Sequence, residues 1–128
     1  MKAWSKLWKS SSQKRKQRKY AFKAPLHIKH KMLGSSLSKE LRKEHKVRSV
    51  PVRKGDTVKI TTGQFKGKSG KVTKVSLANM RVYLEEASLT RTDGTNALYP
   101  IHPSNLEIIK LDLSDKKRAE KLERIKQK

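Results

Sequence analysis

Hydrophobic and polar residues alternate over five short stretches in the middle of the chain, which is the pattern of half-buried β-strands. The predicted strands are residues 57–62, 71–76, 81–85, 97–101 and 106–111. The alternation is strict at Val58 and Ile60, whereas Val72 and Val75 are three positions apart, which predicts a β-bulge or a strong bend. Five short strands separated by turns, with no helix between them, predict a mainly β fold closed into a small five-stranded barrel.

Helical patterns precede the predicted barrel. Pro25 suits a first helical turn, and hydrophobic and histidine side chains recur at helical spacings as far as Gly34, which suits a C-cap. The serine pair 35–36 offers an N-cap to a second helix over residues 37–45. Both helices are short and basic, so we expect them to dock on the barrel rather than to be stable alone.

The residues after these helices and the end of the chain complete the predicted organisation. Residues 47–52 are expected to be extended, because the residue before Pro51 is pushed out of the helical region. Ser114 can cap a C-terminal helix over residues 115–127. The expected segments are a disordered basic arm (1–23), short basic helices (24–50), the barrel (51–113) and a basic C-terminal helix (114–128).

Charge is distributed unevenly along the 128 residues, whose 33 Lys and Arg against 11 Asp and Glu give a net charge of +22. Residues 1–54 hold 18 basic and 2 acidic side chains and residues 116–128 hold 7 and 2, whereas residues 55–115 hold 8 and 7. The predicted barrel is therefore almost neutral, and the arms carry the excess. Because such a charge destabilises a compact chain by self-repulsion, we expect a polyanionic partner, with nucleic acid ahead of an anionic membrane surface.

The strongest electrostatic candidates lie in the run 14–19 of the first arm. Five positive charges in six residues cannot bury enough apolar surface to offset the entropy of ordering, so this arm is expected to be disordered when free. Each phosphate that these side chains neutralise would release a counterion, while a solvated tail or a targeting signal is the alternative interpretation. The RNA-binding candidates in this run are Lys14, Arg15, Lys16, Arg18 and Lys19.

Further candidates follow this run. Tyr20 and Phe22 could either stack on unpaired bases or anchor the arm on the barrel. The glycines of the loop 63–70 permit close backbone approach to a phosphate, although tight turns explain them equally well. The basic candidates between the arm and this loop are Lys29, Lys31, Arg42, Lys43, Lys46, Arg48, Arg53, Lys54, Lys66, Lys68 and Lys71.

Catalytic and metal-binding patterns are weak in this chain. His27 and His30 are three residues apart, as metal ligands on a helix can be. Without any cysteine or a carboxylate cluster nearby, both are expected to stack on or hydrogen-bond to RNA instead. Glu85 ends a predicted strand and Glu86 follows it; because neighbours along a strand point to opposite faces, the two are poorly placed for joint acid–base chemistry. We expect no enzymatic activity, no cofactor, no metal and no small-molecule substrate.

Two stretches at the start of the predicted barrel carry a resemblance. Residues 53–58 (Arg-Lys-Gly-Asp-Thr-Val) and 62–72 (Thr-Gly-Gln-Phe-Lys-Gly-Lys-Ser-Gly-Lys-Val) resemble the KOW motif of ribosomal proteins and transcription elongation factors. The resemblance implies that the barrel is SH3-like and belongs to a domain that often meets RNA.

The flanking residues narrow this resemblance to one family. The matching blocks are residues 24–27, 37–42, 47–56, 92–95, 101–106 and 111–118. Over roughly residues 12–125 the chain resembles family twenty-four of the large-subunit ribosomal proteins, in its archaeal and eukaryotic form, which eukaryotic numbering calls twenty-six. Trp4, Trp8 and the turn 77–80 depart from the family pattern.

The family resemblance implies a structural constituent of the large ribosomal subunit in the cytoplasm. It also implies binding to the 5′ domain of large-subunit rRNA, a role early in subunit assembly, a position near the peptide exit tunnel and neighbouring ribosomal proteins as partners, without membrane insertion. Two alternatives stay open. A KOW-type transcription elongation or RNA-processing factor would usually add a domain and need no arm this basic, and a membrane-active segment is suggested by Trp4 and Trp8 among lysines.

Overall fold

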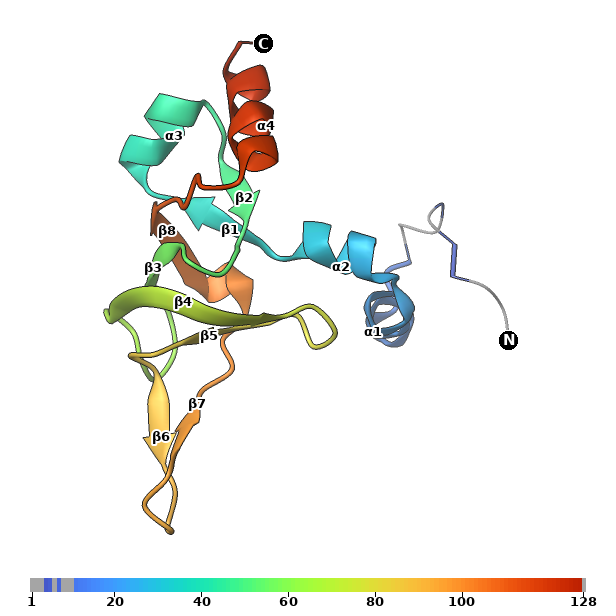
Figure 1. Ribbon diagram of the computed structural model, residues 1–128. Helices are drawn as coiled ribbons and strands as arrows, with labels where there is room; N and C mark the ends of the chain where they lie inside the picture. Colours follow the sequence, from blue (N-terminus) through green and yellow to red (C-terminus); the bar gives the residue numbers. More distant parts are fainter. Residues whose placement is uncertain (1–3, 6, 8–10, 128) are drawn as a thin grey trace.

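The centre of the molecule is a six-stranded sheet with the strand order β2-β1-β8-β3-β4-β5 (Figure 1). The computed structural model describes residues 4, 5, 7 and 11–127, so Trp8 lies outside the described residues. Strands β1 and β8 are parallel, and all other neighbours in this sheet are antiparallel. The strands are β1 (Gly34–Leu37), β2 (Ser49–Pro51), β3 (Thr57–Ile60), β4 (Ser69–Ser76), β5 (Arg81–Leu84) and β8 (Leu106–Lys110).

A separate two-stranded sheet forms a hairpin that projects from one end of the molecule (Figure 1). It consists of β6 (Ser88–Thr90) and β7 (Asn96–Leu98). The strand predicted over residues 97–101 is therefore divided. Its first part belongs to the hairpin, and Ile101 returns to the main sheet through a single bridge to Val82.

The sheet pairings correct the expectation of a closed five-stranded barrel. The main sheet is open, with β2 and β5 at its two edges, and the described residues form eight strands in two sheets. The coarser expectation of a mainly β protein with helices at both ends agrees with the structure. The predicted bulge is confirmed, because the register of β4 against β5 shifts between Val72 and Lys74.

Strand β1 is the element that the residue pattern concealed. Gly34 and the serines 35–36 looked like helix caps, yet they pair with β2 on one side, and β1 reaches β8 on the other. The Ser35 hydroxyl is buried and donates to the Pro103 carbonyl oxygen at 2.6 Å, and Leu37 is fully buried. The buried Ser35 hydroxyl thus has the hydrogen-bond partner that a buried polar group needs. The long-range pairing of β1 outweighs the local capping signal of these residues.

The hydrophobic core lies on one side of the sheet and consists of alternating residues of its strands. The fully buried side chains include Leu37, Val52, Val58, Ile60, Val72, Val82, Leu84, Leu106 and Ile108. Leu122 from the last helix joins the same cluster at 5% exposure. The C-terminal helix is therefore packed on the core, and its basic side chains have a fixed support.

Four helices flank the sheet: α1 (Lys14–Lys23), α2 (Leu26–Met32), α3 (Lys39–His45) and α4 (Lys116–Lys126). The caps differ from those predicted by one to three residues. The Ser38 hydroxyl caps α3 by accepting from the Leu41 N–H, and the Asp115 carboxylate caps α4 by accepting from the Lys117 N–H. In Figure 1, α3 and α4 lie together at one end, and α1 and α2 extend from one side.

Helix α1 occupies part of the arm that we expect to be disordered in the free chain. All of α1 is described, and no residue of it is buried. A helix of ten residues without a buried face is marginal in water. Disorder of this arm in the absence of a partner therefore stays a prediction.

Candidate nucleic-acid interface

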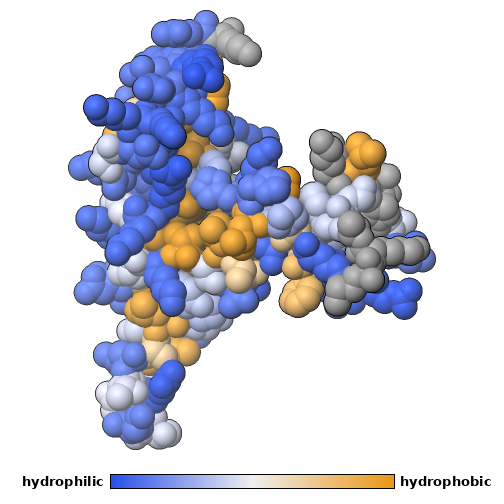
Figure 2. Space-filling view, turned by 45° about the vertical axis from the view of Figure 1, so that its right-hand side comes forward, coloured by the Kyte–Doolittle hydropathy of each residue, from blue (hydrophilic) through white to orange (hydrophobic). Residues whose placement is uncertain are grey.

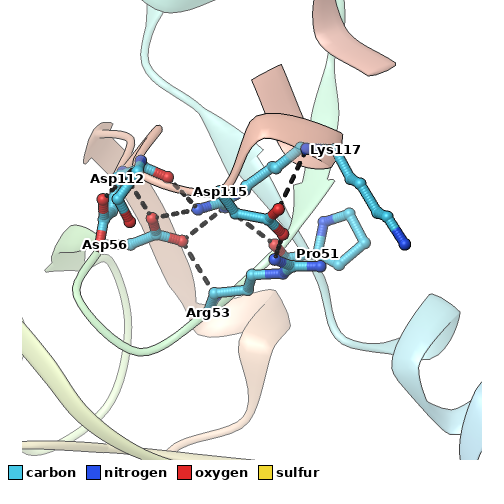
Figure 3. A network of polar contacts seen from close by, with 8 residues as sticks. Pro51, Arg53, Asp56, Asp112, Asp115 and Lys117 are labelled. Atoms are coloured by element: carbon cyan, nitrogen blue, oxygen red, sulfur yellow. Dashed lines mark hydrogen bonds and ion pairs between the residues drawn. The ribbon is translucent and has the colours of Figure 1, made fainter. Parts of the chain in front are cut away.

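A buried ion pair attaches α4 to the sheet (Figure 3). The Asp56 carboxylate, which is fully buried, accepts from Arg118 Nη1 at 2.6 Å and Nη2 at 2.7 Å. It also accepts from the backbone N–H groups of Asp112 at 2.9 Å and Arg53 at 3.0 Å. Arg118 donates further to the carbonyl oxygens of Asp112 and Pro51, so both charged groups have several partners. This network sets the position of the basic α4 surface.

A second, exposed ion pair joins the same two regions. The Arg53 guanidinium donates to the Asp115 carboxylate, and both side chains are about two-fifths exposed (43% and 41%). This hydrogen bond lowers the pKa of Asp115 below its ordinary value. Arg53, one of the predicted phosphate contacts, is therefore already engaged with a carboxylate of the protein.

Lys29 is the predicted RNA contact that the structure places in the interior. Its side chain is only 7% exposed, and its ammonium donates to the Ala78 carbonyl oxygen at 3.1 Å. The ammonium also lies 5.8 Å from the centre of the Phe22 ring. Lys29 thereby links α2 to the turn between β4 and β5, and its charge is directed into the protein.

Most of the other predicted contacts lie on the surface. Arg42 is half-buried, and its Nε donates to the Leu37 carbonyl oxygen at 2.7 Å. Tyr20 and His30 are also half-buried. The exposed candidates are Lys14, Arg15, Lys16, Arg18, Lys19, Phe22, His27, Lys31, Lys43, Lys46, Arg48, Arg53, Lys54, Lys66, Lys68 and Lys71.

The Tyr20 ring is in contact with the tilted ring of Trp4. The Trp4 ring lies 5.0 Å from the Tyr20 ring, centre to centre, at an interplanar angle of 34°. The indole Nε1 donates to the Tyr20 backbone carbonyl oxygen at 3.1 Å. These contacts lie within the arm itself, so both predicted roles of Tyr20, stacking on unpaired bases and anchoring the arm on the barrel, stay predictions.

The exposed candidates form separate groups. The first group lies on α1, the second lies on α2, α3 and the segment up to Lys54, and the third lies on the loop between β3 and β4 and at the start of β4. In that loop Gly67 has a φ of 90° with open space around its missing Cβ, so a turn conformation explains this glycine. Figure 2 shows hydrophilic residues over the end formed by α3 and α4, and hydrophobic residues gathered in the middle of this face.

Cationic groups from α4 and from the residues before β3 lie near His30 of α2. The pKa of His30 is lowered mainly by burial, and the positive charges of Arg53, Lys121 and Arg118 lower it further. These side chains line a groove of about 400 Å³ between α2, β2 and α4. Site prediction from the sequence missed Lys121, although the surplus of charge over residues 116–128 was a visible signal.

The described residues show neither a metal-binding group nor a membrane span. No three His, Asp or Glu side chains among them are grouped as metal ligands. No helix in the described part of the chain is long and apolar enough to cross a bilayer. What the geometry presents is a small β body with lysine and arginine side chains exposed on several helices and one loop.

Such an arrangement defines a basic nucleic-acid-binding protein, since exposed Lys and Arg on rigid supports match a phosphate backbone. The sequence model of one family, the eukaryotic ribosomal proteins L26 together with their archaeal counterparts of family twenty-four, matches residues 11–125. The chain belongs to this family and is a structural protein of the large ribosomal subunit. The resemblance noted over residues 12–125 is thereby confirmed.

Proposed function

We propose that this chain binds the 5′ domain of large-subunit rRNA and helps to fold it early in subunit assembly, near the peptide exit tunnel. The observation that carries the proposal is the exposure of the predicted contacts. Of the 20 candidate side chains, 16 are exposed, and they follow helices and a loop that surround an almost neutral sheet.

The mechanism is electrostatic neutralisation combined with recognition of shape. Each Lys or Arg that contacts a phosphate releases condensed counterions, which favours binding and lets RNA segments approach one another. Side chains cannot read the deep major groove of A-form RNA, so specificity comes from the shape of the folded RNA and from unpaired bases. The buried Asp56–Arg118 pair supports this role, because it fixes the basic face of α4 relative to the sheet.

A salt titration with two matched variants tests the proposal. The first variant replaces Lys14 and Lys16 of α1 by glutamine. The control variant replaces Lys59 and Lys110, which are exposed on β3 and β8, by glutamine as well. Both variants lose two charges, so their net charges are equal. Binding is measured to transcripts of the 5′ domain and of another rRNA domain of similar length.

We expect the α1 variant to lower the slope of log affinity against log salt by about one for each lysine that contacts a phosphate. The control should retain the slope of the unmodified chain. Equal losses in the two variants would show that only total charge matters. Equal affinity for the two transcripts would contradict selective binding of the 5′ domain.

A further inference from the structure

A groove between α1 and the turn that joins β4 to β5 has a composition suited to RNA. Its volume is about 520 Å³, and its walls come from segments far apart in the sequence. Arg18 and Phe22 line it from α1, and Met80, Arg81 and Tyr83 line it from the turn and β5. In Figure 1 the β4–β5 turn reaches toward α1 and α2.

Phe22 is the most unusual residue of this groove. Its ring is 79% exposed, whereas the other phenylalanine of the chain, Phe65, is 8% exposed and belongs to the core. Single exposed hydrophobic side chains are common on protein surfaces, but an exposed ring in a groove beside arginines is a surface on which a base can stack. Phe22 thus offers a flat apolar surface on the wall of the groove.

Lys29 connects the two sides of the groove. This buried ammonium donates to the Ala78 carbonyl oxygen on the turn and lies 5.8 Å from the centre of the Phe22 ring. It connects the corner between α1 and α2 to the opposite wall. With α1 folded, these contacts place the aromatic surface and the turn on opposite sides of the groove.

The charged side chains that line the groove favour an anionic ligand. Its described lining contains two arginines and no acidic side chain. Arg18 lies four residues before Phe22, which places the two side chains on one face of α1. Across the groove, Arg81 Nη1 donates to the Met80 carbonyl oxygen at 3.2 Å, which restrains its guanidinium.

An exposed aromatic ring in a groove that is also lined by two arginines matches an unpaired nucleotide, because the base has a flat π-face and the phosphate is anionic. We infer that this groove binds one unpaired nucleotide of the rRNA, with its base stacked on Phe22 and its phosphates held by Arg18 and Arg81. The inference rests on the proposed binding of rRNA. An acidic peptide would meet the arginines but would leave the Phe22 ring without a flat partner.

The test uses the full chain and two probes with equal numbers of phosphates, a single-stranded oligoadenylate and a short RNA duplex. The variants are Phe22→Ala, the aromatic replacement Phe22→Tyr, and Leu26→Ala as a control. Leu26 is a neighbouring hydrophobic residue that is 59% exposed and does not line the groove. Circular dichroism verifies that each variant keeps the fold of the unmodified chain.

We expect Phe22→Ala to weaken binding of the single strand by roughly 10-fold, the effect of losing one stacked base. Phe22→Tyr should restore the affinity, and Leu26→Ala should leave it unchanged. Duplex binding should be the same in all of these variants. The salt slope should also stay unchanged in Phe22→Ala, whereas Arg18→Gln should lower it by about one.

Several results would overturn the inference. Equal effects of Phe22→Ala and Leu26→Ala, equal effects on duplex and single strand, or no recovery with tyrosine would each exclude base stacking. Competition by a polyglutamate peptide that depends on Phe22 would assign the groove to a protein partner. If the unmodified chain still binds the 5′-domain transcript in these cases, the proposed function stands, while failure to bind that transcript would refute the proposed function itself.

Discussion

The buried Asp56–Arg118 pair allows a quantitative prediction about how α4 is held. In Arg118→Leu the Asp56 carboxylate loses two of its four hydrogen-bond donors and keeps the backbone N–H groups of Asp112 and Arg53. Removing one partner of a buried ion pair costs about 3–5 kcal/mol, because the other charge remains buried without compensation. The two remaining donors place the expected loss at the lower end, about 3 kcal/mol of unfolding free energy.

Urea unfolding of the full chain, followed by circular dichroism, measures this loss. With an m value of about 2 kcal/mol/M, the midpoint should fall by about 1.5 M. The control is Arg53→Leu, which removes the exposed ion pair with Asp115 and should cost less than about 1 kcal/mol. Combining Asp56→Asn with Arg118→Leu should cost less than the sum of the single variants, because the residues interact directly. A loss in Arg118→Leu no larger than that in Arg53→Leu would refute the reasoning.

Two further predictions concern a turn and a histidine. In urea titrations Gly55→Ala should lower the unfolding free energy by more than Gly94→Ala does. Both glycines have a positive φ, which disfavours alanine equally at the two positions. A Cβ at Gly55 would in addition lie 2.5 Å from Asp112 Oδ2, whereas a Cβ at Gly94 would meet open space. Similar losses in the two variants would remove the role assigned to that contact. For His30 the folded-state pKa is lowered from 6.5 by burial and by nearby cations, so below pH 6.5 the unfolded chain binds more protons and stability falls with decreasing pH. His30→Gln should make this fall shallower, and an unchanged pH profile of the urea midpoint would contradict the assignment.

Local patterns predicted the elements whose stability depends on near neighbours in the sequence. The alternation around Val58 and Ile60 predicted β3, and the spacing of Val72 and Val75 predicted the irregularity in β4. Helices α2, α3 and α4 were expected within a few residues of their observed bounds. In each case the signal is the periodicity of one segment, which the chain carries before it folds.

The elements that the patterns missed depend on distant partners. Residues 34–37 have only one hydrophobic side chain, Leu37, and become β1 because β2 and β8 supply hydrogen bonds on both sides. Strands β1 and β2 add two strands beyond the five predicted, and both join the main sheet on the side of β8. The hairpin strand β6 was also missed, because residues 88–90 alternate too briefly to be recognised.

The candidate site was predictable as chemistry and only partly as geometry. Sequence reasoning named Phe22 and Arg18 but gave no reason to group them with Arg81 and Tyr83, which lie across the groove from α1. Lys29 was named as an RNA contact from the sequence, although the fold buries it. In the sequence it is one more lysine of a basic arm, and in the fold its charge is directed at the Ala78 carbonyl oxygen.

The sequence by itself determined the distribution of charge: an almost neutral middle, two basic arms and, with them, a polyanionic partner. This followed from counting, because the ionisation of exposed Lys and Arg does not depend on the fold. Tertiary structure decided which of these charges face outward. Arg118 and its neighbour Lys117 are equivalent in the sequence, yet one is buried against Asp56 and the other is exposed. The reason is physical: a buried charge requires a partner at hydrogen-bonding distance, and only the folding of α4 onto the sheet brings Arg118 to Asp56.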